Sequence, residues 1–309
     1  MFFEGSEKKL EIIVDAAAPK LRSLDRTFWQ GLVAASNADI LSSISNDFCD
    51  AYLLSESSLF VWDDRIVVLT CGASTLVESA CYFIEHIGEQ AISYVCYQRK
   101  NEYYAHLQAS SFGDDVLRLR DFIGGQAYRM GHLDSHHHYI FTTDKHYQAS
   151  PLDTTNELLM YHISGTVADY LRGEHQSTEQ ISQLLQLEQL FSGFSVDQYL
   201  FSPLGYSING IRGAEYFTIH ITPQENSSYV SVETNIDISS NQVDIFAELI
   251  VLLQPNSCDI IGFNSHMANK PMLNYVCLSH CAMTLEQGYN IHFSHYQQDC
   301  LEVLKPILL

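Results

Sequence analysis

The sequence predicts an α+β protein in which two antiparallel sheets pack face to face and carry helices on their outer faces. Apolar runs at 58–62 and 66–71 flank the polar pair Asp63 and Asp64, which is the pattern of a β-hairpin. A similar order of strand, strand, helix and strand then occurs in each half of the 309-residue chain. Two such units give two sheets, and stacking their inner faces produces a four-layer α/β/β/α sandwich.

The first half supplies one of these units. After the hairpin, the apolar spacing predicts a helix at 75–87, and an apolar run predicts a strand at 91–97. A further helix is expected near the start of the chain, at 7–17. These elements together would form one sheet with helices on a single face.

The second half repeats the pattern with more strands at its start. Strands are expected at 204–208, 216–222 and 228–234, then a helix at 243–253 that Pro255 stops, then a strand at 258–263. Two more helices are expected at 155–171 and 179–191. No linker of Pro, Gly or Ser divides the chain, so we expect a single domain with pseudo-repeats at about 1–150 and 151–309.

Composition narrows the class of function. The chain has 16 basic and 37 acidic residues, a formal charge of -21, which argues against a nucleic-acid surface. An acidic field suits cationic ligands, although it also serves solubility alone. We find no basic and apolar leader pattern and no apolar run of about 18 residues, so we expect a cytoplasmic protein without a membrane span. The eight cysteines show no CxxC pair and are expected to be reduced.

The two hairpins place reactive side chains opposite each other. In the first hairpin, Ser57 falls opposite Thr70 or Cys71, depending on the loop length. In the second, the loop at 209–214 places Ser207 roughly opposite His220. A serine with a histidine partner meets the requirement for proton transfer at a hydroxyl group.

These residues lie in six segments with a family resemblance. The segments are 2–8, 54–58, 70–72, six positions within 203–210, then 218–223, and seven positions within 228–235. In content and order they resemble the eukaryotic S-adenosylmethionine decarboxylases, pyruvoyl-dependent enzymes of polyamine synthesis. The resemblance implies the same α/β/β/α sandwich, built by internal duplication. It also implies conversion of S-adenosylmethionine to its decarboxylated form, the aminopropyl donor for spermidine and spermine.

The resemblance implies a self-cleaving proenzyme. Cleavage between Glu56 and Ser57 would give a small chain, 1–56, and a large chain, 57–309. Ser57 would become a pyruvoyl cofactor that forms a Schiff base with the substrate and acts as the electron sink that side chains lack. By the same resemblance, Ser207 steadies the cleavage intermediate and His220 removes the α-proton of Ser57. Cys71 is then the proton donor of decarboxylation, and Glu7 lies near the site.

Substrate-binding positions follow from the same resemblance. Phe3 and Phe201 match a pair that stacks on adenine, Leu54 lies where backbone contacts to the base are made, and Glu56 lies near the site. Gln224 stands where the family usually has a ribose-binding glutamate. This departure leaves open a pyruvoyl decarboxylase that acts on another amino acid.

A second departure concerns putrescine, which activates animal members of the family. The residues that match the acidic set binding putrescine or relaying its effect are Glu11, Asp153, Thr155, Glu157 and Glu233. Leu69 replaces the family's lysine two residues before the proton-donor cysteine. Dependence on putrescine could therefore be stronger or absent. The other interpretation is that Asp153 and Glu157 begin a helix, near its dipole.

Other functions are weighed on the same residues. The run His136, His137 and His138 does not predict a metal site, because consecutive strand residues point to alternate faces. A regulatory paralogue that does not process remains an alternative, although the processing residues are all present. No GxSxG motif surrounds Ser57 or Ser207, which argues against a serine hydrolase. The family contains monomers and homodimers of the processed pair, so the oligomeric state stays open.

Overall fold

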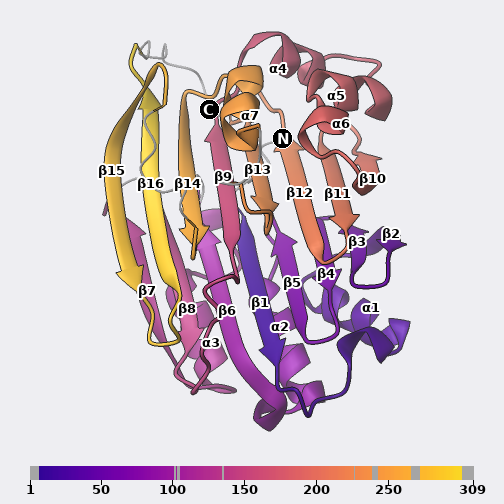
Figure 1. The fold of residues 1–309 in the computed structure, drawn as a ribbon, viewed down its shortest axis with the longest axis vertical. Coiled ribbons are helices and arrows are strands. Elements are labelled where there is room, and N and C mark those ends of the chain that lie inside the picture. Colours follow the sequence, from indigo (N-terminus) through magenta and orange to yellow (C-terminus); the bar gives the residue numbers. More distant parts are fainter. Residues whose placement is uncertain are drawn as a thin grey trace.

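In the part of the chain that the structure describes, two antiparallel sheets of eight strands each form the centre of the molecule (Figure 1). The computed structural model describes residues 7–100, 102, 105–133, 136–225, 227–238, 243–265 and 272–300. From edge to edge, the first sheet contains β2 (Ile40–Ser45), β3 (Asp50–Leu54), β4 (Ser57–Val61), β5 (Arg65–Thr70), β1 (Lys8–Val14), β6 (Ile92–Lys100), β8 (His137–Thr143) and β7 (Gly125–Gly131). The second contains β10 (Ser195–Leu200), β11 (Tyr206–Arg212), β12 (Glu215–Thr222), β13 (Tyr229–Thr234), β9 (Thr155–Tyr161), β14 (Ser257–Phe263), β16 (Asn290–Gln298) and β15 (Tyr275–Thr284).

The two sheets have the same strand order. Each strand of the second sheet occupies the place of the strand eight positions earlier in the first, so that β9 corresponds to β1 and β12 to β4. Helices α2 (Leu76–Ile87) and α7 (Ile245–Leu253) fall at equivalent points, after β5 and β13. This correspondence indicates the internal duplication expected from the sequence.

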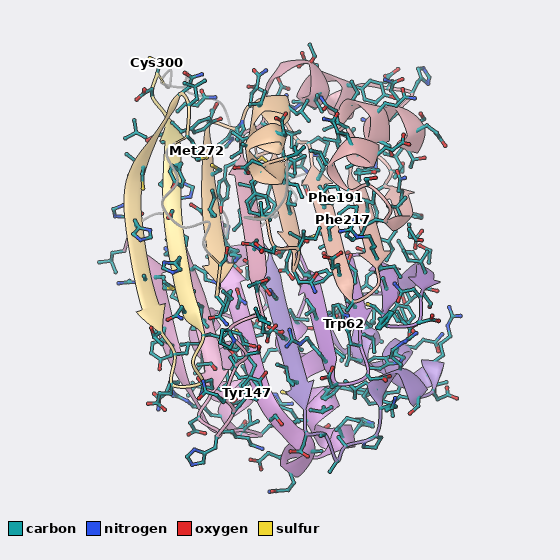
Figure 2. All side chains as sticks on the ribbon, in the orientation of Figure 1. Trp62, Tyr147, Phe191, Phe217, Met272 and Cys300 are labelled. Carbon is teal, nitrogen blue, oxygen red and sulfur yellow. The ribbon has the colours of Figure 1, made fainter. Side chains whose placement is uncertain are left out.

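Helices cover the outer face of each sheet. The first sheet packs its outer face against α1 (Arg26–Ala35), α2 and α3 (Phe112–Arg120), and the second against α4 (Gly165–Arg172), α5 (Thr178–Leu184), α6 (Leu187–Leu190) and α7. Phe191, for example, stacks on Phe217 of β12 with 3.7 Å between ring centroids (Figure 2). Short 3-10 turns lie at Leu21–Ser23, Glu89–Ala91 and Ala105–Leu107. The four-layer α/β/β/α sandwich is thus confirmed.

Each strand predicted from the sequence overlaps a strand of the structure, although the prediction named fewer strands than the structure has. Of the predicted helices, one was wrong and two were right only in part. Residues 7–17 form β1 rather than a helix, because Lys9 and Glu11 are buried between the sheets beside opposite charges. The stretch 155–171 divides into β9 and α4 at His162, whose φ is 54°. The stretch 179–191 divides into α5 and α6 at Gln186, whose φ is 53°. Positive φ values interrupt both helical patterns.

The helix-start interpretation of Asp153 and Glu157 is also wrong. Asp153 precedes β9 and Glu157 lies within it, fully buried. Their carboxylates therefore meet side-chain cations rather than a helix terminus. Among the described residues, none of the helices has the length and apolar character needed to span a membrane.

Candidate active site

A tight turn holds the bond between Glu56 and Ser57. Strands β3 and β4 pair so that Leu54 lies opposite Ser57, leaving only Ser55 and Glu56 to make the turn. Ser57 has a φ of 145°, a value that non-glycine residues rarely adopt. Backbone strain of this kind costs of order 1–3 kcal/mol and persists only where the surrounding structure enforces it. The fold therefore concentrates strain at this peptide bond.

The carbonyl of Glu56 is the acceptor in two contacts from Cys71. The Cys71 backbone N–H donates to it at 3.0 Å, and the thiol lies 3.4 Å from the same oxygen. The Ser57 hydroxyl is buried and has no hydrogen-bond partner among the described residues. A polarised carbonyl thus lies beside a hydroxyl that is not engaged elsewhere. Of the two partners that the sequence left open for Ser57, the structure has Thr70. The contact from the Cys71 backbone was not predicted, because it also depends on the turn that places the Glu56 carbonyl.

His220 lies in the second sheet and links it to the first. Ser207 pairs with His220 in register, as predicted, and its hydroxyl lies 2.7 Å from the Nδ1 atom. The Nε2 atom lies 2.7 Å from Thr218 Oγ1 and 3.2 Å from Ser58 Oγ. Burial lowers the pKa of His220 to about 3, so the ring is neutral at physiological pH and is available as a base.

Two further residues complete the connection between the sheets. Ser58 Oγ donates to Asn209 Oδ1 at 2.6 Å, and Asn209 Nδ2 donates to the backbone carbonyl of Tyr52 at 3.0 Å. Sequence reasoning gave no role to Ser58, Asn209 or Thr218, although all three lie in the matched segments. Thr218 could have been found from the sequence, because it is two residues from His220 on one strand and their side chains therefore lie on the same face.

Glu7 is buried beside the strand that neighbours His220. It accepts a hydrogen bond from Ser231 Oγ at 2.7 Å, and Ser231 is the strand neighbour of His220. Burial, reinforced by the nearby carboxylate of Glu233, raises the pKa of Glu7 to about 8. Glu7 is therefore largely protonated at neutral pH and can donate a hydrogen bond.

The predicted substrate-binding residues that the structure describes lie in β3, in the turn after it, or just after β10 and β12. Leu54 is buried opposite Ser57, and burial raises the pKa of the Glu56 carboxyl beside it. Phe201 and Gln224 follow β10 and β12, at the end of the second sheet nearest Ser207 and His220. The Phe201 ring lies 4.8 Å from that of Tyr199. Phe3 lies outside the described residues.

A cluster of buried charges fills the space between the sheets beside this group. Lys9 Nζ lies 2.9 Å from Glu233 and 3.2 Å from Glu157, and Lys100 Nζ lies 2.6 Å from Glu157. Burial by itself would raise the pKa of Glu157, but Lys100 and Lys9 bring it down to about 2. Lys9 is the register partner of Leu69. Lys9, on the neighbouring strand β1, therefore supplies a cation where Leu69 has none.

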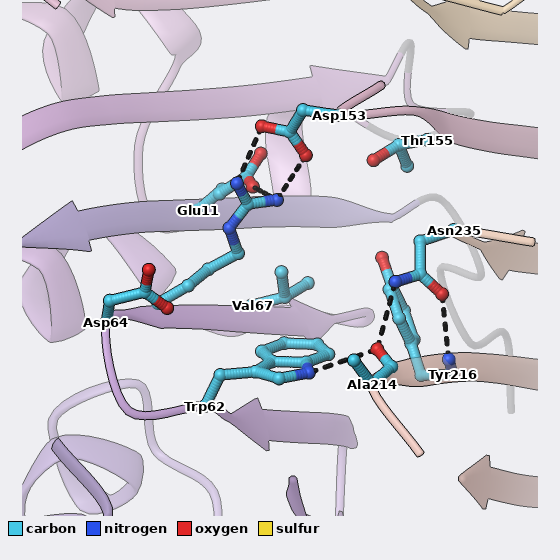
Figure 3. A pocket seen from close by; sticks show the side chains of 10 residues that line it. Glu11, Trp62, Asp64, Val67, Asp153, Thr155, Ala214, Tyr216 and Asn235 are labelled. Carbon is cyan, nitrogen blue, oxygen red and sulfur yellow. Dashed lines mark hydrogen bonds and ion pairs between the residues drawn. The ribbon is translucent and has the colours of Figure 1, made fainter. Parts of the chain in front are cut away.

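A pocket of about 210 Å³ is lined by Glu11 and Tyr216, among others (Figure 3). Tyr216 connects the pocket to this cluster by donating a hydrogen bond to Glu233. Arg65 lies along its wall and makes two hydrogen bonds of 2.6 Å to Asp153, together with an ion pair of 3.0 Å to Glu11. Thr155 lines the same pocket without a dashed contact in the view. The acidic side chains predicted to serve putrescine thus contact cations of the protein itself.

The chain is similar to known proteins of one family. The model of the family described as adenosylmethionine decarboxylase matches residues 1–301. Similar proteins named S-adenosylmethionine decarboxylase proenzyme include those of Leishmania donovani, 33% identical over 84% of this chain and 73% of the relative, and of Xenopus laevis, 35% identical over 79% and 80%. The proenzyme of Dictyostelium discoideum is 30% identical over 96% of this chain and 86% of its own length.

A solved structure shares the fold. The Trypanosoma brucei AdoMetDC-delta26 monomer superposes with a TM-score of 0.60 and 23% identity, covering 78% of this chain and 99% of the solved one. The match in fold and the family match along almost the whole chain point the same way. The chain belongs to the adenosylmethionine decarboxylase family.

Proposed function

We propose that this protein is a proenzyme that cuts itself between Glu56 and Ser57 and then decarboxylates S-adenosylmethionine. The observation that carries the proposal is the Glu56 carbonyl, held by the Cys71 N–H at 3.0 Å beside the buried Ser57 hydroxyl. The product would be the aminopropyl donor for spermidine and spermine. The family to which the chain belongs supports this substrate.

Cleavage would begin with attack of Ser57 Oγ on the Glu56 carbonyl carbon. The C–N bond breaks as an ester forms, and the Cys71 N–H stabilises the charge that develops on the carbonyl oxygen. Departure from the positive φ of Ser57 releases backbone strain in the same step. His220, neutral and held by Ser207, is then the base that removes the α-proton of Ser57, so that elimination frees the Glu56 carboxylate.

Elimination would leave dehydroalanine at position 57, which tautomerises to an imine; water then hydrolyses the imine to a pyruvoyl group and releases ammonia. The residues around Ser57 fit that group. A pyruvoyl group at position 57 would supply the electron sink that decarboxylation needs. The Cys71 thiol would deliver a proton to the product carbon, from the position it holds near the carbonyl of residue 56. Glu7, protonated at neutral pH, would orient polar atoms of the substrate without repelling its carboxylate. Phe201 would stack on adenine, and Gln224 would hydrogen-bond the ribose.

We further propose that putrescine is not required. Lys9, Lys100 and Arg65 already contact the carboxylates that a diamine would neutralise. A diammonium ligand would have to displace a buried cation that is held by two or more contacts. Decarboxylation should therefore show no response to added putrescine. An activation of several-fold would instead favour a diamine bound at the pocket beside Arg65.

Intact mass under denaturing conditions tests the cleavage. Two chains divided between residues 56 and 57, the larger one blocked by pyruvate, are the expected result. Ser57→Ala should give a single uncut chain of 35.0 kDa, whereas the neighbouring Ser55→Ala, outside the reacting bond, should still be cut. A wild-type chain that stays whole would favour the regulatory alternative.

Carbon dioxide release from labelled S-adenosylmethionine then tests the substrate. Release from this compound, with none from ornithine or arginine, is the expected result. Cleavage without any release from S-adenosylmethionine would overturn the substrate and favour a different amino acid.

A further inference from the structure

Two histidines and an aspartate converge at a point outside the proposed active site. Asp259 of β14 and His295 of β16 are register partners in the second sheet, and His136 immediately precedes β8 of the first. In the row of register partners, Ser231 and Leu159 separate Asp259 from His220. Three strand spacings of about 4.8 Å put the two groups roughly 14 Å apart.

The three side chains present ligand atoms to one another. Asp259 Oδ1 lies 2.7 Å from His295 Nδ1, Asp259 Oδ2 lies 3.4 Å from His136 Nδ1, and all three ligand atoms lie within 4.8 Å of one another. The two imidazole rings stack with 3.8 Å between centroids. We propose that His136, Asp259 and His295 bind a divalent transition metal ion such as Zn²⁺, which ties the two sheets together.

The donor set and spacing suit this metal class. Two imidazole nitrogens and a carboxylate oxygen are ligands of Zn²⁺, and bonds of about 2.1 Å in a tetrahedron place donors about 3.4 Å apart. The observed separations bracket that value, so small side-chain rotations would bring the three atoms onto one ion. Three protein ligands leave the fourth position to a water molecule.

The surroundings supply the other features of a metal site. Tyr161 donates a hydrogen bond of 2.8 Å to Asp259 Oδ2, which orients the carboxylate in the manner of outer-shell partners. Asp259 and His295 are buried, but the His136 side chain is 22% exposed, which provides a route of entry. The argument against the consecutive histidines does not apply here, because the three ligands come from separate segments: β14, β16 and the residue before β8.

Metal binding by the untagged protein tests the proposal. After removal of bound metal with a chelator, titration calorimetry with Zn²⁺ should show one ion per chain, and the thermal midpoint should rise with its concentration. Co²⁺ should give the visible absorption of a tetrahedral nitrogen and oxygen site. His136→Ala and His295→Ala should each weaken Zn²⁺ binding by at least about 10- to 100-fold, since even outer-shell changes cost that much.

Matched controls separate this site from other histidines. His137→Ala changes the residue after His136, the first of β8, and His280→Ala changes a histidine on β15. Both variants should bind Zn²⁺ as the wild type does. Thermal unfolding of each metal-free variant confirms that it is folded. If His295→Ala does not fold, the partly exposed His136→Gln carries the test. Wild-type protein that binds no Zn²⁺, or His136 variants that bind it undiminished, would overturn the proposal and leave a hydrogen-bonded histidine, aspartate and histidine bridge.

Discussion

Replacing Lys9 with methionine tests the charge balance between the sheets. The side chain keeps its length but loses the ammonium group that lies 2.9 Å from Glu233 and 3.2 Å from Glu157. Removing one partner of a buried ion pair costs about 3–5 kcal/mol, because the remaining charge is uncompensated. At roughly 2 °C per kcal/mol for a protein larger than 150 residues, the thermal midpoint should fall by about 6–10 °C.

The measurement is best made in the uncut Ser57→Ala background, where a single chain unfolds. Urea and thermal unfolding give the loss, and Leu69→Lys in the same protein should recover part of it, because position 69 faces position 9 in the register. Putrescine should stabilise the Lys9→Met protein more than its parent, since it supplies two ammonium groups. A loss below about 1 kcal/mol, or no recovery with Leu69→Lys, would refute the view that Lys9 is the balancing cation.

Three more predictions concern residues of the proposed active site. His220→Ala should slow cleavage by about 10²-fold or more. The pKa of His220 in the wild type is about 3, so the cleavage rate measured on gels should show no inflection near pH 6.5. The pKa of Glu7 is raised to about 8, so its contribution to stability is full below about pH 4.5 and is lost as the pH rises towards 8. In Glu7→Gln, the free energy of unfolding measured with urea should therefore change less with pH over that range. Cys71→Ala keeps the backbone N–H at the Glu56 carbonyl, so intact mass should show cleavage while carbon dioxide release falls sharply.

Much of the fold could be predicted because the strands are apolar and their hairpins are short. The pairing of Ser207 with His220 follows from one Gly-bearing loop, and the structure has that register. The prediction failed at β1 and β9, where the charged residues Lys9, Glu11 and Glu157 lie within buried strands. These charges are buried only because partners arrive from other strands, so no local pattern could distinguish them from the polar face of a helix.

In the site too, sequence segments pointed to individual residues, but they did not predict contacts between residues far apart in the chain. The family segments identified Ser57, Cys71 and His220, but the strain at Ser57 depends on β3, a strand that the sequence pattern did not suggest. The contact of Ser58 with Asn209 joins residues 151 positions apart, across two sheets. Such contacts follow from the packing of the sheets, which a single sequence does not encode at any one position.

The place of β1 has a consequence for the cut protein. This strand lies in the interior of the first sheet, hydrogen-bonded to β5 on one side and β6 on the other, yet it belongs to the segment before residue 57. The shorter fragment would therefore remain threaded through the longer one after cleavage, and neither could leave without opening a sheet. Renaturation of the cut protein would then be a second-order reaction between two polypeptides, whereas the precursor folds as one. The rate of refolding would thus depend on protein concentration after self-cleavage, but not before it.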